Sequence, residues 1–212
     1  MPNDPDATKV RSGIYRLLAT ALSSPKADTP GLYDALLKAR SALRPTEDPL
    51  KGLRATENPS FASLTKEHLR LFVGPGHAPC SPYEAVHRKD RPDFEKGLVM
   101  GPSTADVKRS YLAAGLDFTK TYTDLPDHIA TEMEFMHFLC SEESRLAATG
   151  NNSEAAKMKA MQREFHKNHI VPWVKDLADC ILRSTTSPFY QATAEVLKDF
   201  AQSETDYLAE AA

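Results

Sequence analysis

Apolar residues recur every three to four positions along almost the whole chain. In residues 10–21 they form one helical face that includes Val10, Ile14 and Leu18, and the same spacing returns in 29–43 and 61–72. No stretch shows the sustained alternation of apolar and polar residues that is typical of strands. The pattern therefore predicts an all-α fold.

Glycine and proline divide this pattern into about nine or more helices. Gly115 and Gly150 each follow an apolar-periodic stretch and predict helix ends, while Pro172 interrupts another, because proline removes a backbone donor. The predicted helical segments are 10–21, 29–43 with Thr29 as its cap, 61–72, 103–115 with Ser103 as its cap, 124–149, 153–183 broken at Pro172, and a last helix from Ser187 and Pro188.

These segments form one globular domain. We expect the helical domain to span 9–207, with flexible ends at 1–8 and 208–212. The proline-rich stretch 44–59 is predicted to be a loop and a possible hinge for the exchange of helices between protomers. Both a monomer and a domain-swapped dimer therefore remain open.

Composition excludes several classes of protein. The chain has 212 residues, of which 41% are hydrophobic and 26% charged, with a formal net charge of -3. Its cationic residues are scattered, which argues against nucleic-acid binding. No apolar run reaches the roughly 20 residues of a membrane span, and no signal peptide precedes the first helix, so we expect a cytoplasmic protein without stable membrane insertion.

The three cysteines suggest neither a disulfide framework nor a zinc site. Cys80, Cys140 and Cys180 are odd in number, lie far apart in sequence and form no Cys-x-x-Cys pair. Each is expected to be a small buried hydrophobic residue. No metal site is predicted from them.

The richest chemistry lies in residues 124–139. On a helical wheel, His128 and Glu132 fall inside the apolar arc that contains Met133 and Met136, and they are four residues apart. A carboxylate facing a core needs a partner, so a buried His128–Glu132 pair is expected. Asp127 precedes them and has two interpretations: it caps its own helix, or it binds a cationic ligand.

A second unusual segment, 71–84, places three prolines and two glycines between helices. It lacks the spacing of a phosphate-binding loop, so it predicts either a stiff connection or a shaped binding surface. Together the two segments resemble the TorD/DmsD family of redox-enzyme maturation chaperones. The resemblance rests on Leu-Phe-Val-Gly-Pro-Gly at 71–76, Pro-Tyr-Glu at 82–84, Leu-Pro-Asp-His-Ile-Ala at 125–130, Glu-x-Glu-Phe-Met-His-Phe-Leu at 132–139 and Phe-His-Lys-Asn-His-Ile-Val-Pro-Trp at 165–173.

This resemblance implies a TorD-like cytoplasmic chaperone rather than an enzyme. It would bind the twin-arginine signal peptide or the apo form of a molybdenum-cofactor oxidoreductase subunit, assist cofactor insertion and prevent premature export. It implies no resident cofactor, although some relatives bind guanine nucleotide or molybdopterin guanine dinucleotide. The residues carried over or chosen as client-binding candidates are Phe72, Gly74, Pro75, Pro82, Tyr83, Glu84, Asp124, Pro126, Asp127, His128 and Glu132.

Two further expectations and two alternative functions complete the predictions. We expect a groove between the 71–84 loop and the start of the helix at Asp124, and we expect Asp127→Ala to weaken client-peptide affinity more than folding. Two Glu-x-x-His spacings, at 84–87 and 134–137, leave open a di-iron enzyme, although the second lies off the centre of the apolar arc. A general helical scaffold that binds partner helices through its methionines is the other alternative.

Overall fold

Helices dominate the computed structural model, which describes residues 5–48, 59–74, 78–90, 92, 100–117 and 124–210. Within those residues there are nine α-helices and no strand, so the predicted all-α fold is confirmed. They are α1 (Pro5–Leu22), α2 (Tyr33–Leu43), α3 (Phe61–His68), α4 (Glu84–His87), α5 (Pro102–Ala113), α6 (Ile129–Ala148), α7 (Asn152–Phe165), α8 (Val174–Ser184) and α9 (Pro188–Glu210).

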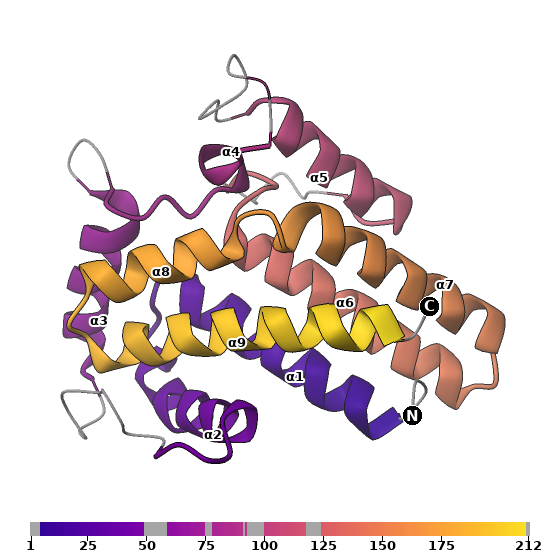
Figure 1. Ribbon diagram of the computed structural model, residues 1–212, viewed down its shortest axis with the longest axis horizontal. Coiled ribbons are helices and arrows are strands. Elements are labelled where there is room, and N and C mark those ends of the chain that lie inside the picture. The colour runs from indigo at the N-terminus through magenta and orange to yellow at the C-terminus, as the bar shows by residue number, and fades with distance from the viewer. Residues whose placement is uncertain are drawn as a thin grey trace.

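Helix α6 lies at the centre of the molecule, with α1 and α7 packed along it, while α8 and α9 run antiparallel beside each other (Figure 1). Its predicted apolar arc faces the core: Ile129, Met133, Met136 and Leu139 are all buried. Burying such a stripe stabilises the fold by about 25 cal/mol for each Å² of apolar surface that is removed from water. Helix α6 is therefore the element on which neighbouring parts of the fold are positioned.

The predicted helix ends are largely confirmed. Gly115 and Gly150 follow α5 and α6 with φ of 78° and 77°, a backbone conformation that glycine adopts without strain. The chain also breaks near Pro172, between a π-helical turn at His166–Ile170 and α8. Helices extend further at both ends than predicted, since α1 begins at Pro5 and α9 continues to Glu210, with Leu208 buried.

Three other helix starts, those of α2, α5 and α6, also differ from the prediction. Helix α5 begins at Pro102, so Ser103 lies inside its first turn instead of capping it. The Thr29 hydroxyl accepts a hydrogen bond from the Lys26 amide instead of capping α2. Helix α6 starts at Ile129 rather than near Asp124. Pro126 disfavours helical geometry at the residue before it, and residues 127–129 are engaged in an extended pairing described below.

A buried polar cluster joins α1, α6, α7 and α9. The Arg11 guanidinium donates to both carboxylate oxygens of Glu204 at 2.7 and 2.8 Å and to the side-chain oxygen of Gln162 at 2.8 Å. The Tyr15 hydroxyl donates to Glu204, and Gln162 donates to Glu143. Because buried charges need partners, this cluster holds four helices in one register.

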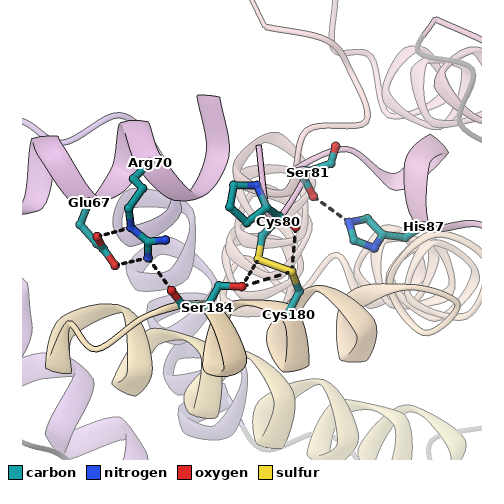
Figure 2. The surroundings of a disulfide bond; sticks show 8 residues. Glu67, Arg70, Cys80, Ser81, His87, Cys180 and Ser184 are labelled. Atoms are coloured by element: carbon teal, nitrogen blue, oxygen red, sulfur yellow. Dashed lines mark hydrogen bonds and ion pairs between the residues drawn. A yellow bond between two sulfur atoms is a disulfide. The ribbon is translucent and has the colours of Figure 1, made fainter. Parts of the chain in front are cut away.

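The cysteine prediction is wrong for two of the three residues. Cys80 and Cys180 form a disulfide between the segment after α3 and α8, with their Cα atoms 5.7 Å apart (Figure 2). Their separation of 100 residues hid this pairing, because only the tertiary fold brings the two segments together. Cys140 is a free buried thiol, as expected.

Candidate client-binding site

The two motif segments meet at the start of α6. The Glu84 amide donates to the Asp127 carbonyl at 2.9 Å, and the Ile129 amide donates to the Pro82 carbonyl at 2.8 Å. The Tyr83 and His128 rings, at the centre of this antiparallel bridge, pack edge to face with centroids 5.3 Å apart. The structure therefore brings Pro82, Tyr83 and Glu84 next to Asp127 and His128.

Three of the predicted acidic residues are fully buried at this junction. Glu84, Asp127 and Glu132 each have 0% relative exposure. Glu84 forms an ion pair with Arg88 and accepts a hydrogen bond from His169 Nδ1 at 3.1 Å. A peptide lying on the protein surface therefore has no direct access to these three carboxyl groups.

Asp127 caps a neighbouring helix instead of its own. Its carboxylate accepts hydrogen bonds from the Ala85 amide at 3.2 Å, in the first turn of α4, and from the Thr104 hydroxyl at 3.0 Å, in α5. Burial raises the pKa of Asp127, while these two hydrogen bonds act in the opposite direction. Asp127 thus joins α4 and α5 to the start of α6.

The predicted pair between His128 and Glu132 does not form. His128 is the N-cap of α6, and its Nδ1 accepts a hydrogen bond from the Ala130 amide at 3.1 Å, so that nitrogen is unprotonated. Burial lowers the pKa of His128. Neither carboxyl oxygen of Glu132 has a hydrogen-bond partner in the described part of the chain. Burial, followed by the charges of Glu84 and Asp127, raises the pKa of Glu132 well above its usual value, which favours the neutral acid.

The remaining predicted residues are divided between the core and the surface. Phe72 is buried against the His68 and Tyr190 rings, with centroids 5.0 and 5.8 Å away. Gly74 ends a π-helical turn at Leu69–Val73 with φ of 55°, and Pro75 lies outside the described residues. Pro126 accepts a hydrogen bond at its carbonyl from the Tyr111 hydroxyl. Asp124 is exposed.

Two adjoining cavities lie along the outer flank of α6. The first, of about 470 Å³, is bounded by the end of α1, by residues 23–29 and by the start of α6, and its lining includes the acidic residues Asp28, Asp124 and Glu134. The second, of about 440 Å³, lies between the end of α5 and α6 and is largely apolar, with Leu116, Phe135 and Phe138 in its lining. Thr131 and Glu134 line both, so the two cavities are neighbours on the surface of α6.

This arrangement differs from the groove that the sequence predicted. The 82–84 segment and the start of α6 are in direct contact where they are described, so the predicted space is filled at Pro82 and Tyr83. Of the predicted site residues, Asp124 lines the acidic cavity. The sequence pattern did not indicate that Asp28 and Glu134 line a shared cavity. The placement of Glu134 off the apolar arc, next to Phe135 and Phe138, was the available signal.

The two Glu-x-x-His spacings do not form a shared centre. Glu84 is buried against Arg88 and His169, whereas Glu134 lies at the surface near Arg16, at 3.8 Å. His137 Nδ1 is engaged with the Ser12 hydroxyl. Across the described ranges, no cluster of three or more His, Cys, Asp or Glu side chains is arranged to hold a metal ion.

None of the helices in the described residues combines the length and the apolar character needed to cross a membrane.

Comparison with known proteins places the chain in a family. Residues 27–179 match the model of the family described as nitrate reductase delta subunit. The chlorate reductase assembly chaperone protein of Ideonella dechloratans is 29% identical, over 74% of this chain and 78% of its own length. The perchlorate reductase assembly chaperone protein of Dechloromonas aromatica is 26% identical, over 92% and 88%.

The chaperone protein TorD of Shewanella pealeana is also similar, at 23% identity over 94% of this chain and 90% of its own length. All three relatives are named as chaperones and not as enzymes. Since the matched family model covers well over half of the sequence, the chain belongs to the nitrate reductase delta subunit family, and its predicted identity as a TorD-like redox-enzyme maturation protein is confirmed.

Proposed function

We propose that this protein is a cytoplasmic, system-specific chaperone for the catalytic subunit of a molybdenum-cofactor reductase. It binds the twin-arginine signal peptide or the apo form of that subunit, assists cofactor insertion and delays export until the subunit is mature. Relatives that align with most of this chain and are named for the assembly of chlorate and perchlorate reductases support the choice of client class. No cofactor of its own is part of this proposal.

The observation that carries the proposal is that the acidic and the apolar cavity lie next to each other along α6. A signal peptide begins with a cationic segment and continues with an apolar one. The acidic cavity, lined by Asp28, Asp124 and Glu134, fits the arginine pair, and the cavity lined by Phe135 and Phe138 fits the apolar segment. A peptide that lies along α6 can therefore place its arginine pair in the first cavity and its apolar segment in the second.

The acidic cavity also contains two cations, which bear on this assignment. Arg16 and Lys26 contribute to its lining together with Asp28, Asp124 and Glu134. Arg16 lies 3.8 Å from Glu134, with side chains 64% and 59% exposed. An ion pair that exposed contributes little, so a peptide arginine can replace Arg16 at Glu134 at small cost, with bidentate geometry available to its guanidinium.

The test is a calorimetric titration with synthetic signal peptides of the host's molybdoenzymes. We expect saturable binding to at least one twin-arginine peptide and weaker binding to its twin-lysine analogue, because lysine cannot form the bidentate contact. Asp124→Asn and Glu134→Gln should each weaken binding about 3- to 10-fold, corresponding to roughly 1 kcal/mol for a partly exposed charged contact.

A matched control is available on α7. Glu154 is a partly exposed glutamate in a surface ion pair, 2.6 Å from Lys157, and it does not line either cavity. Glu154→Gln should leave peptide affinity unchanged. Equal losses in Glu134→Gln and Glu154→Gln would reject the assigned site, whereas no binding of any signal peptide to the wild-type protein would reject signal-peptide recognition itself.

A further inference from the structure

The disulfide lies beside the motif bridge. Cys80 is fully buried and is located two residues before Pro82, whose carbonyl binds the start of α6. Cys180, on α8, is partly exposed. Figure 2 shows the two sulfurs between the 78–83 segment and α8, with Ser184 on one side and the Ser81–His87 contact on the other. The covalent bond therefore attaches the segment that leads into the bridge to a different helix.

An oxygen atom also lies close to each of the two sulfurs. Cys80 Sγ lies 3.6 Å from the Ser184 hydroxyl oxygen, and Cys180 Sγ lies 3.1 Å from the Pro79 carbonyl oxygen. A thiol is a weak hydrogen-bond donor, and each cysteine has one of these oxygens nearby as an acceptor when the disulfide is reduced. Reduction therefore forms each S–H group close to an oxygen acceptor.

The elements that carry the cysteines are held by other contacts. Helix α8 buries Leu177, Ala178 and Ile181 in the core and packs along α9. Cys80 is tied to α3's extension through its amide, which donates to the Leu71 carbonyl at 3.0 Å. Breaking the disulfide therefore does not require α8 to unfold. In the folded protein its direct effect is to release the 78–84 segment from α8.

We propose that Cys80 and Cys180 form a reversible thiol–disulfide modification site that takes a low-molecular-weight disulfide as oxidant and controls how firmly the 78–84 segment is held. The partly exposed Cys180 thiolate attacks the oxidant RSSR, forming a mixed disulfide and releasing one RS⁻. The Cys80 thiolate then attacks the Cys180 sulfur and releases the second RS⁻. The two protons lost by the cysteines end on the two RSH products, and excess RSH reverses both steps.

The redox conditions of the compartment determine whether the disulfide or the dithiol form predominates. In a reducing compartment the dithiol form is populated, and the disulfide forms when the ratio of oxidised to reduced small thiols rises. Because the 82–84 residues pair with 127–129, the redox state of the cysteines is transmitted to the N-terminal end of α6. This inference does not depend on the identity of any client.

The chemical test is equilibration of the native protein in glutathione buffers, followed by an acid quench and alkylation after denaturation. Mass spectrometry should count three modified cysteines in reducing buffer and one, Cys140, in oxidising buffer, with the same titration curve in both directions. Cys180→Ser should show no such transition, while the matched control Cys140→Ala should keep it. A constant thiol count across all buffers, or a disulfide between two protein molecules, would overturn the proposal.

The conformational test is hydrogen exchange on the two forms. Oxidation should slow exchange of amides in 80–90 and 127–130 and leave those of α1 unchanged. It should also raise the melting temperature by about 4–16 °C, because the crosslink restricts the unfolded chain. Identical exchange at 80–90 and 127–130 in the oxidised and reduced wild-type protein would show that the crosslink does not control the segment.

Discussion

Substitution of Asp127 is the most direct way to separate a structural from a ligand-binding role of the motif. In Asp127→Ala, the Ala85 amide and the Thr104 hydroxyl lose their acceptor in a fully buried site. Each unsatisfied buried donor costs about 1–3 kcal/mol. Removal of the carboxyl group also relieves part of the unfavourable burial that raises the pKa of Asp127.

The net loss should therefore be about 2–4 kcal/mol of unfolding free energy, which lowers the melting temperature by roughly 4–16 °C for a chain of this size. Asp127→Asn retains one carbonyl-type acceptor, so its loss should be about half as large. Urea unfolding followed by circular dichroism measures both values, and signal-peptide titration well below the melting temperature gives the corresponding affinities.

Asp124 offers the matched comparison, since it is an exposed carboxylate three residues earlier and lines the acidic cavity. Asp124→Ala should change stability by less than about 0.5 kcal/mol and weaken peptide binding. If Asp127→Ala instead loses less than about 1 kcal/mol while binding falls tenfold, Asp127 contacts the peptide directly and the structural argument is refuted.

Three other predictions concern buried polar groups. Arg11→Met should cost about 3–5 kcal/mol in chemical denaturation, because it leaves the Glu204 carboxylate buried without its cation; a loss below 1 kcal/mol would contradict this. The raised pKa of Glu132 means that the folded wild-type protein holds this proton more tightly than the unfolded chain, so the free energy of unfolding falls as pH rises above about 4.5. Glu132→Gln should therefore be more stable than the wild-type protein at pH 8, and this difference should shrink toward pH 5. Burial lowers the pKa of His68 to about 4, so the stability that the neutral imidazole contributes should be lost as pH falls from 6.5 to about 4. In urea titrations, His68→Leu should make the free energy of unfolding less dependent on pH over that range.

The helices could be predicted because their apolar spacing is local information. The arc on α6 that includes Met133 and Met136 is buried as the helical wheel indicates, and Gly150 ends that helix. The start of α6 was placed too early because residues 127–129 pair with residues 82–84, and no local pattern records that pairing. A long-range backbone contact thus overrode a local helical signal.

The site was less predictable for the same reason. The helical wheel placed Glu132 in the core, but it could not show that Glu84 and Asp127 lie near it. It also could not show that His128 accepts a hydrogen bond from the Ala130 amide instead of pairing with Glu132. The Cys80–Cys180 disulfide spans 100 residues and could not be inferred from spacing. Sequence therefore identified which residues are unusual, while only tertiary structure showed what each one contacts.

The motif and the candidate binding surface are adjacent but distinct, and this has a consequence for mutational studies. Asp127 and Glu84 are buried and fix the 82–84 segment against the start of α6, whereas Asp124, which precedes that start, lines the acidic cavity. A substitution of Glu84 or Asp127 displaces the support of Asp124, so it should lower affinity and stability together. If the proposed site is correct, a substitution at Asp124 or Glu134 should lower affinity alone. The ratio of the loss in affinity to the loss in stability then distinguishes a supporting residue from one that touches the client.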